Sequence, residues 1–346
     1  SVHANCKHKT NPVFPVELYK INNKAFKLKN KEQVDKVLDE IKKESSFEIS
    51  KITEKKRLKK PAPPFMTSTI QQDAYNKLGF SVSKTMMIAQ KLYEGIPLQD
   101  TSKPEALITY MRTDSLRISD TALKDSRNFI FKKFGNKYLP KTANIYSKKG
   151  AQDAHEAIRP INVEVTPEIA KKYLKPDEAK LYSLIWKRFV ACQMTQAEYF
   201  QRQVLISGGK YTLKATGSSL IFDGFLKVYS VEEENEKAIQ IPKDIKEKDL
   251  VKLEKIGGKQ HFTQPPPRYT EATLVKELEK QGVGRPSTYA AILSTIQKRE
   301  YVIKEKFATI ANSNYVSSTH PSSWKRNKNN RKCNKGFKKN TMHFKR

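Results

Sequence analysis

Tyr110 and Arg112 stand two residues apart at the polar end of an apolar run, Glu105-Ala-Leu-Ile-Thr-Tyr-Met-Arg-Thr-Asp-Ser115. In an extended segment, side chains at positions i and i+2 point the same way, so we expect the phenol and the guanidinium on one face. A phenol is a weak nucleophile at neutral pH, and an adjacent cation stabilises both the phenolate and the charge that builds on an attacked phosphate. The pair therefore favours phosphoryl transfer to tyrosine. The alternative is that Tyr110 is a strand aromatic and Arg112 a solvated end.

A second stretch, residues 150–160, places His155 and Arg159 four residues apart. If residues 151–159 form a short helix that ends at Pro160, the two side chains lie on one face. A histidine and an arginine on one face can grip a phosphate, and the histidine can donate a proton. The alternative is that His155 caps a packed helix and Arg159 complements the dipole at its C-terminal end.

A third stretch predicts two helices joined by the turn Gly282-Val283-Gly284. Thr270 is expected to cap the first helix, over residues 271–281, and Arg285-Pro286-Ser287-Thr288 to open the second. Free backbone amides, two hydroxyls and an arginine at a helix N-terminus form an anion-binding site. The alternative is an ordinary helical hairpin with a glycine turn.

Charge is the strongest feature of the composition. The 346 residues include 66 Lys and Arg against 36 Asp and Glu, a net charge of +30. Such an excess favours a polyanionic partner, and nucleic acid is the usual one. No apolar run approaches the roughly 18 residues of a membrane-spanning helix, so no membrane partner is expected. The three cysteines form no C-x-x-C pair, which argues against a zinc ribbon or a disulfide framework and suits a reducing cytoplasm.

The elements that position these residues alternate between helical and β-rich blocks. Residues with a period of two predict strands within 14–29, 203–229 and 250–256, with His261 and Phe262 also in the sheet. Residues with a helical period predict helices over 31–43, 70–78, 83–93, 119–134 and 176–194. In the third of these we expect Ser83 as the N-cap and the methionines in the core. The basic run 51–60 is expected to be an extended linker or edge, the alternative being a solvated lysine face, and residues 1–13 show no period. The fold class is therefore α+β.

Three motifs in this order resemble those of the bacterial type IA DNA topoisomerases, in the topoisomerase I branch. They are Ile108-Thr-Tyr-Met-Arg-Thr-Asp-Ser115, Ala154-His-Glu-Ala-Ile-Arg-Pro160 and Gly282-Val-Gly-Arg-Pro-Ser-Thr-Tyr289. Four further stretches resemble the same family: Phe65 to Thr69, Leu78 to Phe80, Thr85 to Gln90 and Leu184 to Met194. The resemblance covers about residues 14–303.

The resemblance implies a role for each matching residue. Tyr110 matches the nucleophile that attacks a single-strand phosphodiester, links to the 5′ phosphate and releases a 3′ hydroxyl. Arg112 matches the arginine that holds the scissile phosphate. The second motif, with His155, Glu156 and Arg159, is implied to lie near the DNA backbone. The third motif is implied to contact the single strand upstream of the break through Gly282, Val283, Gly284, Arg285, Ser287 and Thr288.

The resemblance also implies a multidomain arch and its division along the chain. The implied parts are residues 1–14 as a remnant of a joining segment, 15–68 and 196–262 as a β-rich gate domain, 69–195 as the helical domain that carries the tyrosine, and 263–303 as a helical DNA-binding segment. Residues 304–346, with one acid among many lysines and arginines, are expected to be a basic tail without regular structure.

The family places an acidic Mg²⁺-binding domain ahead of these motifs, and this sequence contains no such acidic cluster. We therefore expect Mg²⁺ dependence for the family, no metal ligands in this chain, and an incomplete cleavage machinery. The expected partners are single-stranded and negatively supercoiled DNA, with no ATP, for a monomer in the bacterial cytoplasm at the nucleoid. The alternative function is a non-catalytic single-stranded DNA-binding module in which Tyr110 stacks on a base.

Overall fold

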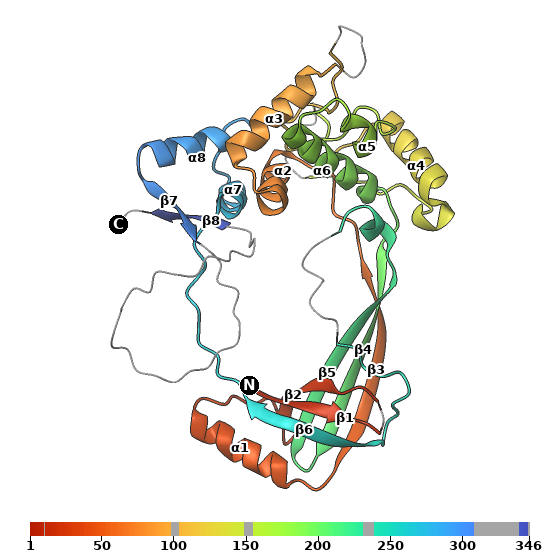
Figure 1. The fold of residues 1–346 in the computed structure, drawn as a ribbon, viewed down its shortest axis with the longest axis vertical. Helices are drawn as coiled ribbons and strands as arrows, with labels where there is room; N and C mark the ends of the chain where they lie inside the picture. Colours follow the sequence, from red (N-terminus) through yellow and green to blue (C-terminus); the bar gives the residue numbers. More distant parts are fainter. Residues whose placement is uncertain (10, 98–103, 149–154, 231–238, 308–338, 345–346) are drawn as a thin grey trace, which may run out of the picture. The chain divides into compact units, whose positions relative to one another are not determined.

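The computed structural model describes all of the chain except residues 10, 98–103, 149–154, 231–238, 308–338 and 345–346. The described residues form two compact units (Figure 1). Unit 1 consists of residues 1–63, 123–144 and 190–265, and unit 2 of residues 64–122, 145–189 and 266–346. A barrel dominates unit 1 and helices dominate unit 2, which confirms the α+β, multidomain class.

Unit 1 is built on a closed barrel of six strands in the order β1-β2-β5-β4-β3-β6. All neighbouring strands in it are antiparallel. The strands are β1 (Val2–Lys7), β2 (Phe14–Ile21), β3 (Phe47–Lys59), β4 (Ala197–Gly208), β5 (Tyr211–Phe222) and β6 (Leu250–Gly258).

Side chains with a period of two fill the barrel, as the sequence predicts for half-buried strands. Ile49, Val204, Ile206 and Leu213 are fully buried in this core. Helix α1 (Lys31–Lys43) adds Val37 and Ile41 to the same cluster, and the Asn30 side chain caps it by accepting a hydrogen bond from the Gln33 amide.

Strand β3 continues well past the barrel core, in register with β4 from Glu48 opposite Ser207 to Lys59 opposite Ala197. The basic run 51–60, expected as an extended linker or edge or as a solvated lysine face, is mostly strand and keeps most of its lysines exposed. The extended edge and the lysine face are present, and the linker is not. Exposed lysines leave no apolar alternation from which the length of the strand could be predicted.

Two further sequence predictions in unit 1 are wrong, and one strand was not predicted. Residues 2–7, which show no period in the sequence, form β1, whose pairing with both β2 and β6 closes the barrel. Residues 225–229 are not a strand, because β5 already ends at Phe222 and a short 3-10 helix, η3 (Gly224–Lys227), follows it. His261 and Phe262 lie beyond β6 and join no strand.

The first helices of unit 2 are α2 (Thr67–Asp73), a π-helical turn η1 (Ala74–Leu78) and α3 (Val82–Glu94). Gly79 ends the π-helical turn at φ 68, a left-handed conformation that glycine adopts at low cost. The N-cap of α3 is Ser81, whose side chain accepts from the Lys84 amide, and not the predicted Ser83. Met87 is 55% exposed, so the predicted burial of both α3 methionines is also wrong.

Helices α4 (Asp120–Phe134) and α6 (Pro176–Cys192) contribute residues to both units, with a four-residue helix α5 (Pro167–Ala170) ahead of α6. The predicted apolar face of α6 is buried, including Leu181, Ile185 and Phe189. No described helix is long and apolar enough to cross a membrane.

The last elements of unit 2 are α7 (Glu271–Lys280), α8 (Tyr289–Lys298), β7 (Val302–Phe307) and β8 (Lys339–Phe344). Val82 of α3, Leu274 and Val275 of α7, Leu293 of α8 and Val302 of β7 share one buried cluster. Strands β7 and β8 pair antiparallel, so the predicted tail without regular structure contains a strand at each end of its described part. Residues 308–338 of that prediction lie outside the described residues.

Truncation of the barrel core tests this packing. Ile206→Ala in β4 should lower the free energy of unfolding by about 2–5 kcal/mol, because it opens a cavity in a filled barrel. Ile221→Ala in β5 is the matched control, because Ile221 is 57% exposed and should cost less than about 0.5 kcal/mol. Urea denaturation followed by circular dichroism measures both. Equal losses would show that the barrel interior is not the stabilising core.

Candidate active site around Tyr110

The segment that carries Tyr110 is an irregular chain anchored at isolated bridges, not the strand that the apolar run predicts. Ile108 bridges Pro160, and Leu107 and Ile108 are buried. Downstream, burial alternates, with Met111 and Thr113 buried and Arg112 exposed. Residues 111–113 therefore alternate between buried and exposed as predicted, although no strand ladder holds this segment.

Thr67, the first residue of α2, holds the chain on the C-terminal side of Tyr110. Its hydroxyl donates to the Met111 carbonyl at 2.7 Å and accepts from the Thr113 amide at 2.8 Å. The Thr67 amide donates to the Thr113 carbonyl at 2.9 Å. Thr67 is fully buried, so these bonds are shielded from water and fix the backbone around Arg112.

Thr109 holds the chain on the other side of Tyr110 against the second motif. Its amide donates to the Arg159 carbonyl at 2.9 Å, and its hydroxyl donates to the Ala157 carbonyl at 2.7 Å. The Arg159 amide in turn donates to the Thr109 hydroxyl at 3.0 Å. The first two motifs are therefore one hydrogen-bonded structure, although they lie far apart in the sequence.

Two other rings flank the Tyr110 ring. The His155 imidazole lies 4.9 Å away between centroids, tilted by 45°, and the Tyr93 ring lies 5.4 Å away at 67°, an edge-to-face contact. Tyr93 belongs to the last turn of α3. The structure thus brings together Tyr110 and His155, which the sequence predicts as site residues, and adds an aromatic residue that it does not predict.

The predicted helix over residues 151–159 is wrong for its described part, because residues 155–159 form a bend and a bridge. Residues 151–154 lie outside the described residues. The pairing that the structure shows is Glu156 with Arg159, at 2.7 Å between carboxylate and guanidinium. Burial opposes ionisation of Glu156, but the hydrogen bond and charge of Arg159 outweigh it and lower the pKa of the carboxyl. Arg159 thus braces the loop that presents His155.

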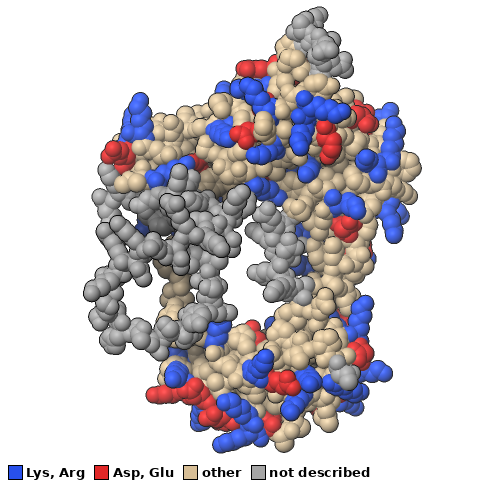
Figure 2. Space-filling view, in the orientation of Figure 1, with Lys and Arg blue, Asp and Glu red and all other residues tan. Residues whose placement is uncertain are grey.

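Arg112 is exposed and makes no hydrogen bond or ion pair with any residue that the structure describes. A free guanidinium two residues from a phenol is available to an external anion, and its fork geometry matches two phosphate oxygens. The space-filling view shows lysines and arginines spread over the helical part of the molecule, with fewer acids among them (Figure 2).

The third motif forms a turn that ends one residue before α8, so the prediction that Arg285 and Pro286 open the helix is wrong. Thr288 is the N-cap, and its hydroxyl accepts from the Arg285 amide at 2.8 Å. The Arg285 guanidinium folds back on the Gly284 carbonyl at 2.8 Å. Ser287 and Val283 are exposed.

Electrostatics connect this turn with the Tyr110 segment. The pKa of Tyr289, the first residue of α8, is raised by burial, by Glu279 and by Asp114, and Arg285 opposes the rise. Asp114 belongs to the Tyr110 motif, so the start of α8 lies within electrostatic range of that segment. Lys148 ties α7 to the start of α2, with its ammonium 2.6 Å from Glu279 and 3.5 Å from the Met66 sulfur.

The donors around Tyr110 do not form a magnesium site. Mg²⁺ prefers carboxylate and other oxygen ligands, whereas the groups beside Tyr110 are rings and cations. The Glu156 carboxylate, in the second motif, is already paired with Arg159. Across the part of the chain that the structure describes, no three His, Cys, Asp or Glu side chains converge.

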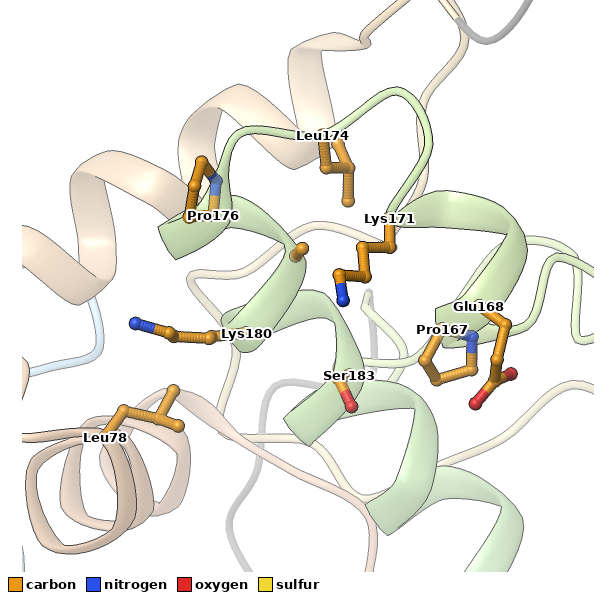
Figure 3. A pocket seen from close by; sticks show the side chains of 9 residues that line it. Leu78, Pro167, Glu168, Lys171, Leu174, Pro176, Lys180 and Ser183 are labelled. Atoms are coloured by element: carbon orange, nitrogen blue, oxygen red, sulfur yellow. The ribbon is translucent and has the colours of Figure 1, made fainter.

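A separate cavity of about 590 Å³ lies within unit 2 and contains none of the predicted site residues (Figure 3). Two leucines and two prolines line part of its wall, and the Lys171 side chain points into it. Its lining consists of Leu78, Pro167, Glu168, Lys171, Leu174, Pro176, Ala179, Lys180 and Ser183.

Comparisons with known proteins all point to one family. A family model described as DNA topoisomerase matches residues 1–318. DNA topoisomerase 1 of Rickettsia felis is 45% identical over 309 residues, which cover 87% of this chain and 39% of that protein. DNA topoisomerase 1 of Helicobacter pylori is 46% identical over 300 residues, covering 84% of this chain and 40% of that protein.

A solved structure, the full-length topoisomerase I of Thermotoga maritima, matches with a TM-score of 0.68 and 39% sequence identity over 88% of this chain and 48% of that one. The chain belongs to the bacterial type IA DNA topoisomerase family, as the three motifs predict. It spans about two fifths of the length of the curated relatives.

Sequence reasoning missed Thr67 and Tyr93 as parts of the site. Thr67 lies in the stretch Phe65 to Thr69, which resembles the family, but nothing in its spacing connects it with Tyr110. Tyr93 ends a helix whose periodicity concerns packing, so its ring contact with Tyr110 follows from the tertiary structure alone.

Removal of the Thr67 hydroxyl tests the clamp on the Tyr110 segment. Thr67→Val keeps the shape but leaves the Thr113 amide and the Met111 carbonyl without their buried partner, so it should cost about 1–3 kcal/mol of stability. Hydrogen exchange at the Thr113 amide should speed up. Thr295→Val in α8, at an exposed position, is the control and should change neither quantity. Unchanged exchange at Thr113 in Thr67→Val would contradict the clamp.

Acid titration tests the Glu156–Arg159 pair. Because the folded-state pKa of Glu156 is lowered, its stabilisation is complete above the ordinary value of 4.5 and is lost as pH falls through the folded value. Glu156→Gln should therefore cost about 1–3 kcal/mol at neutral pH and much less in strong acid. The exposed pair partner Glu254 offers a control, since Glu254→Gln should change stability by under 1 kcal/mol. The same loss at both pH values would disprove the charge effect.

Proposed function

We propose that the chain is the strand-cleaving core of a type IA DNA topoisomerase. In this reaction the Tyr110 oxygen attacks a phosphodiester of single-stranded DNA, the new bond is a 5′-phosphotyrosine and the leaving group is the 3′ hydroxyl. Attack by that hydroxyl reverses the step and reseals the strand after another strand has passed. The phosphotyrosine conserves the energy of the broken ester, so relaxation of negative supercoils needs no ATP.

The observation that carries the proposal is the pinned Tyr110 segment between His155 and an exposed, uncommitted Arg112. Thr67 and Thr109 hold both sides of Tyr110, so the nucleophile is positioned before DNA arrives. Arg112 holds the attacked phosphate and stabilises its developing charge. His155 contacts the same backbone and can donate a proton to the leaving oxygen.

The remaining predicted residues serve as DNA contacts in this proposal. Arg159 and Glu156 brace the His155 loop and approach the backbone. The turn at residues 282–288 offers exposed amides, hydroxyls and an arginine to the strand upstream of the break. The basic excess supplies the salt-dependent part of binding.

Mg²⁺ is expected for the family reaction, and its ligands are expected outside this chain. We propose that they belong to an acidic domain of the family, which the chain must meet before it can cleave efficiently. A monomer that acts on DNA in the bacterial cytoplasm, at the nucleoid, stays a prediction.

A second candidate is a single-stranded DNA-binding module without cleavage. The cluster of the Tyr93, Tyr110 and His155 rings favours it, because aromatic rings can stack on nucleobases without any chemistry. The two functions differ in one observable, a covalent bond between Tyr110 and DNA.

Mixing the chain with a separately produced acidic domain of the family, Mg²⁺ and a labelled single-stranded oligonucleotide tests the proposal. A covalent adduct should form, and Tyr110→Phe should abolish it. Arg112→Ala should reduce its yield about 10²- to 10³-fold, the usual effect of removing a group that stabilises developing charge. The exposed Tyr173 offers the control, since Tyr173→Phe should leave the adduct unchanged.

Three outcomes separate the candidates. An adduct that persists in Tyr110→Phe would disprove the assigned nucleophile. Salt-sensitive binding with no adduct under any condition would favour the binding module. An adduct formed by the chain without the acidic domain would show that this domain is dispensable.

A further inference from the structure

The loop between α3 and the Tyr110 segment is closed at its base, and this closure fixes Tyr93. Ile96 and Glu105 exchange two backbone hydrogen bonds, at 3.0 and 3.1 Å. The Leu107 amide donates to the Leu92 carbonyl at 2.8 Å. Gly95, at φ 111, lets the chain turn there, and any Cβ on it would lie about 3.0 Å from Pro104. The end of α3 and the Tyr110 segment therefore form one rigid junction.

Tyr93 is held at this junction but is not a core residue. Its ring is 38% exposed, and its hydroxyl has no hydrogen bond to any described residue. The buried Tyr182, by contrast, donates its hydroxyl to the Val165 carbonyl at 2.6 Å. A tyrosine that is fixed by its backbone, packed edge-to-face on another ring and still open to solvent has an apolar face available for a ligand.

Nucleic-acid bases are the ligands that such a face suits beside a phosphate-binding residue. Aromatic side chains stack on bases of any sequence, and cations hold the phosphates between them. Tyr110 must reach a phosphate with its hydroxyl, so its own ring cannot also lie flat on a base. The Tyr93 ring, 5.4 Å from it, is free to do so.

We propose that Tyr93 is a further DNA-binding residue, which stacks on a nucleobase next to the phosphate that Tyr110 attacks. The proposal rests on the proposed function, because that function places DNA at Tyr110. It adds a contact to a base, whereas the residues assigned above act on the phosphate backbone.

The test measures binding of the full chain to short single-stranded oligonucleotides by fluorescence anisotropy at constant salt. Tyr93→Ala should bind about 5- to 100-fold more weakly, the range for loss of one stacked base. Tyr93→Phe keeps the ring and should bind like the unaltered chain. Tyr173→Ala is the matched control at another exposed tyrosine, 45% exposed, and should have no effect. Circular dichroism melting confirms that each variant is folded.

Oligonucleotides with a single abasic site at successive positions identify the base. The loss of binding affinity caused by Tyr93→Ala should disappear when the abasic site occupies one particular position. That position should lie within about two nucleotides of the break mapped from the Tyr110 adduct. A loss that persists at every abasic position, or no loss at all, would overturn the proposal. So would a position far from the break.

These outcomes are separate from failure of the proposed function. An adduct at Tyr110 with no abasic-specific effect of Tyr93→Ala would leave the proposed function intact and remove only this inference. The absence of any adduct would remove the proposed function and, with it, the placement of the stacked base beside an attacked phosphate.

Discussion

The structure around Tyr110 depends on two threonine hydroxyls. Thr67 and Thr109 each bond to backbone groups of a distant segment, one on either side of the tyrosine. The segment that carries Tyr110 has no strand ladder or helix of its own, so these side-chain bonds hold it in place of regular structure. A side chain in an irregular chain must be positioned by tertiary contacts, and for Tyr110 these come from α2 and the loop before Pro160.

The two arginines near Tyr110 differ in whether they have a partner within the protein. Arg159 is committed to Glu156 and to its own loop, whereas Arg112 has no partner among the described residues. The sequence cannot make this distinction, because both arginines stand near a chemically interesting residue and both would suit a phosphate. The fold decides it, by giving one arginine a half-buried carboxylate and leaving the other exposed.

Much of the fold could be predicted where periodicity was strong. Helix α1 begins and ends where its apolar spacing predicts, α7 has the predicted Thr270 cap, and the turn between β4 and β5 lies where expected. Predictions failed where a residue's role depended on distant partners. β1 is paired with β2 and β6, which lie far from it in the sequence or follow it. Where a helix was predicted around His155, the backbone instead forms hydrogen bonds with Phe65 and Thr109. The presence of Tyr110 in a site was predictable, but its neighbours Thr67 and Tyr93 were not.

The bridge between Ile96 and Glu105 makes the distance between Tyr93 and Tyr110 independent of the length of the loop that joins them. Because the two residues are joined at the base of the loop, the number of residues between them does not set the distance from Tyr93 to Tyr110. Loop closure entropy grows only slowly with length, so insertions there cost little stability. Related chains can therefore lengthen or shorten this connection without changing the distance between the two tyrosine rings.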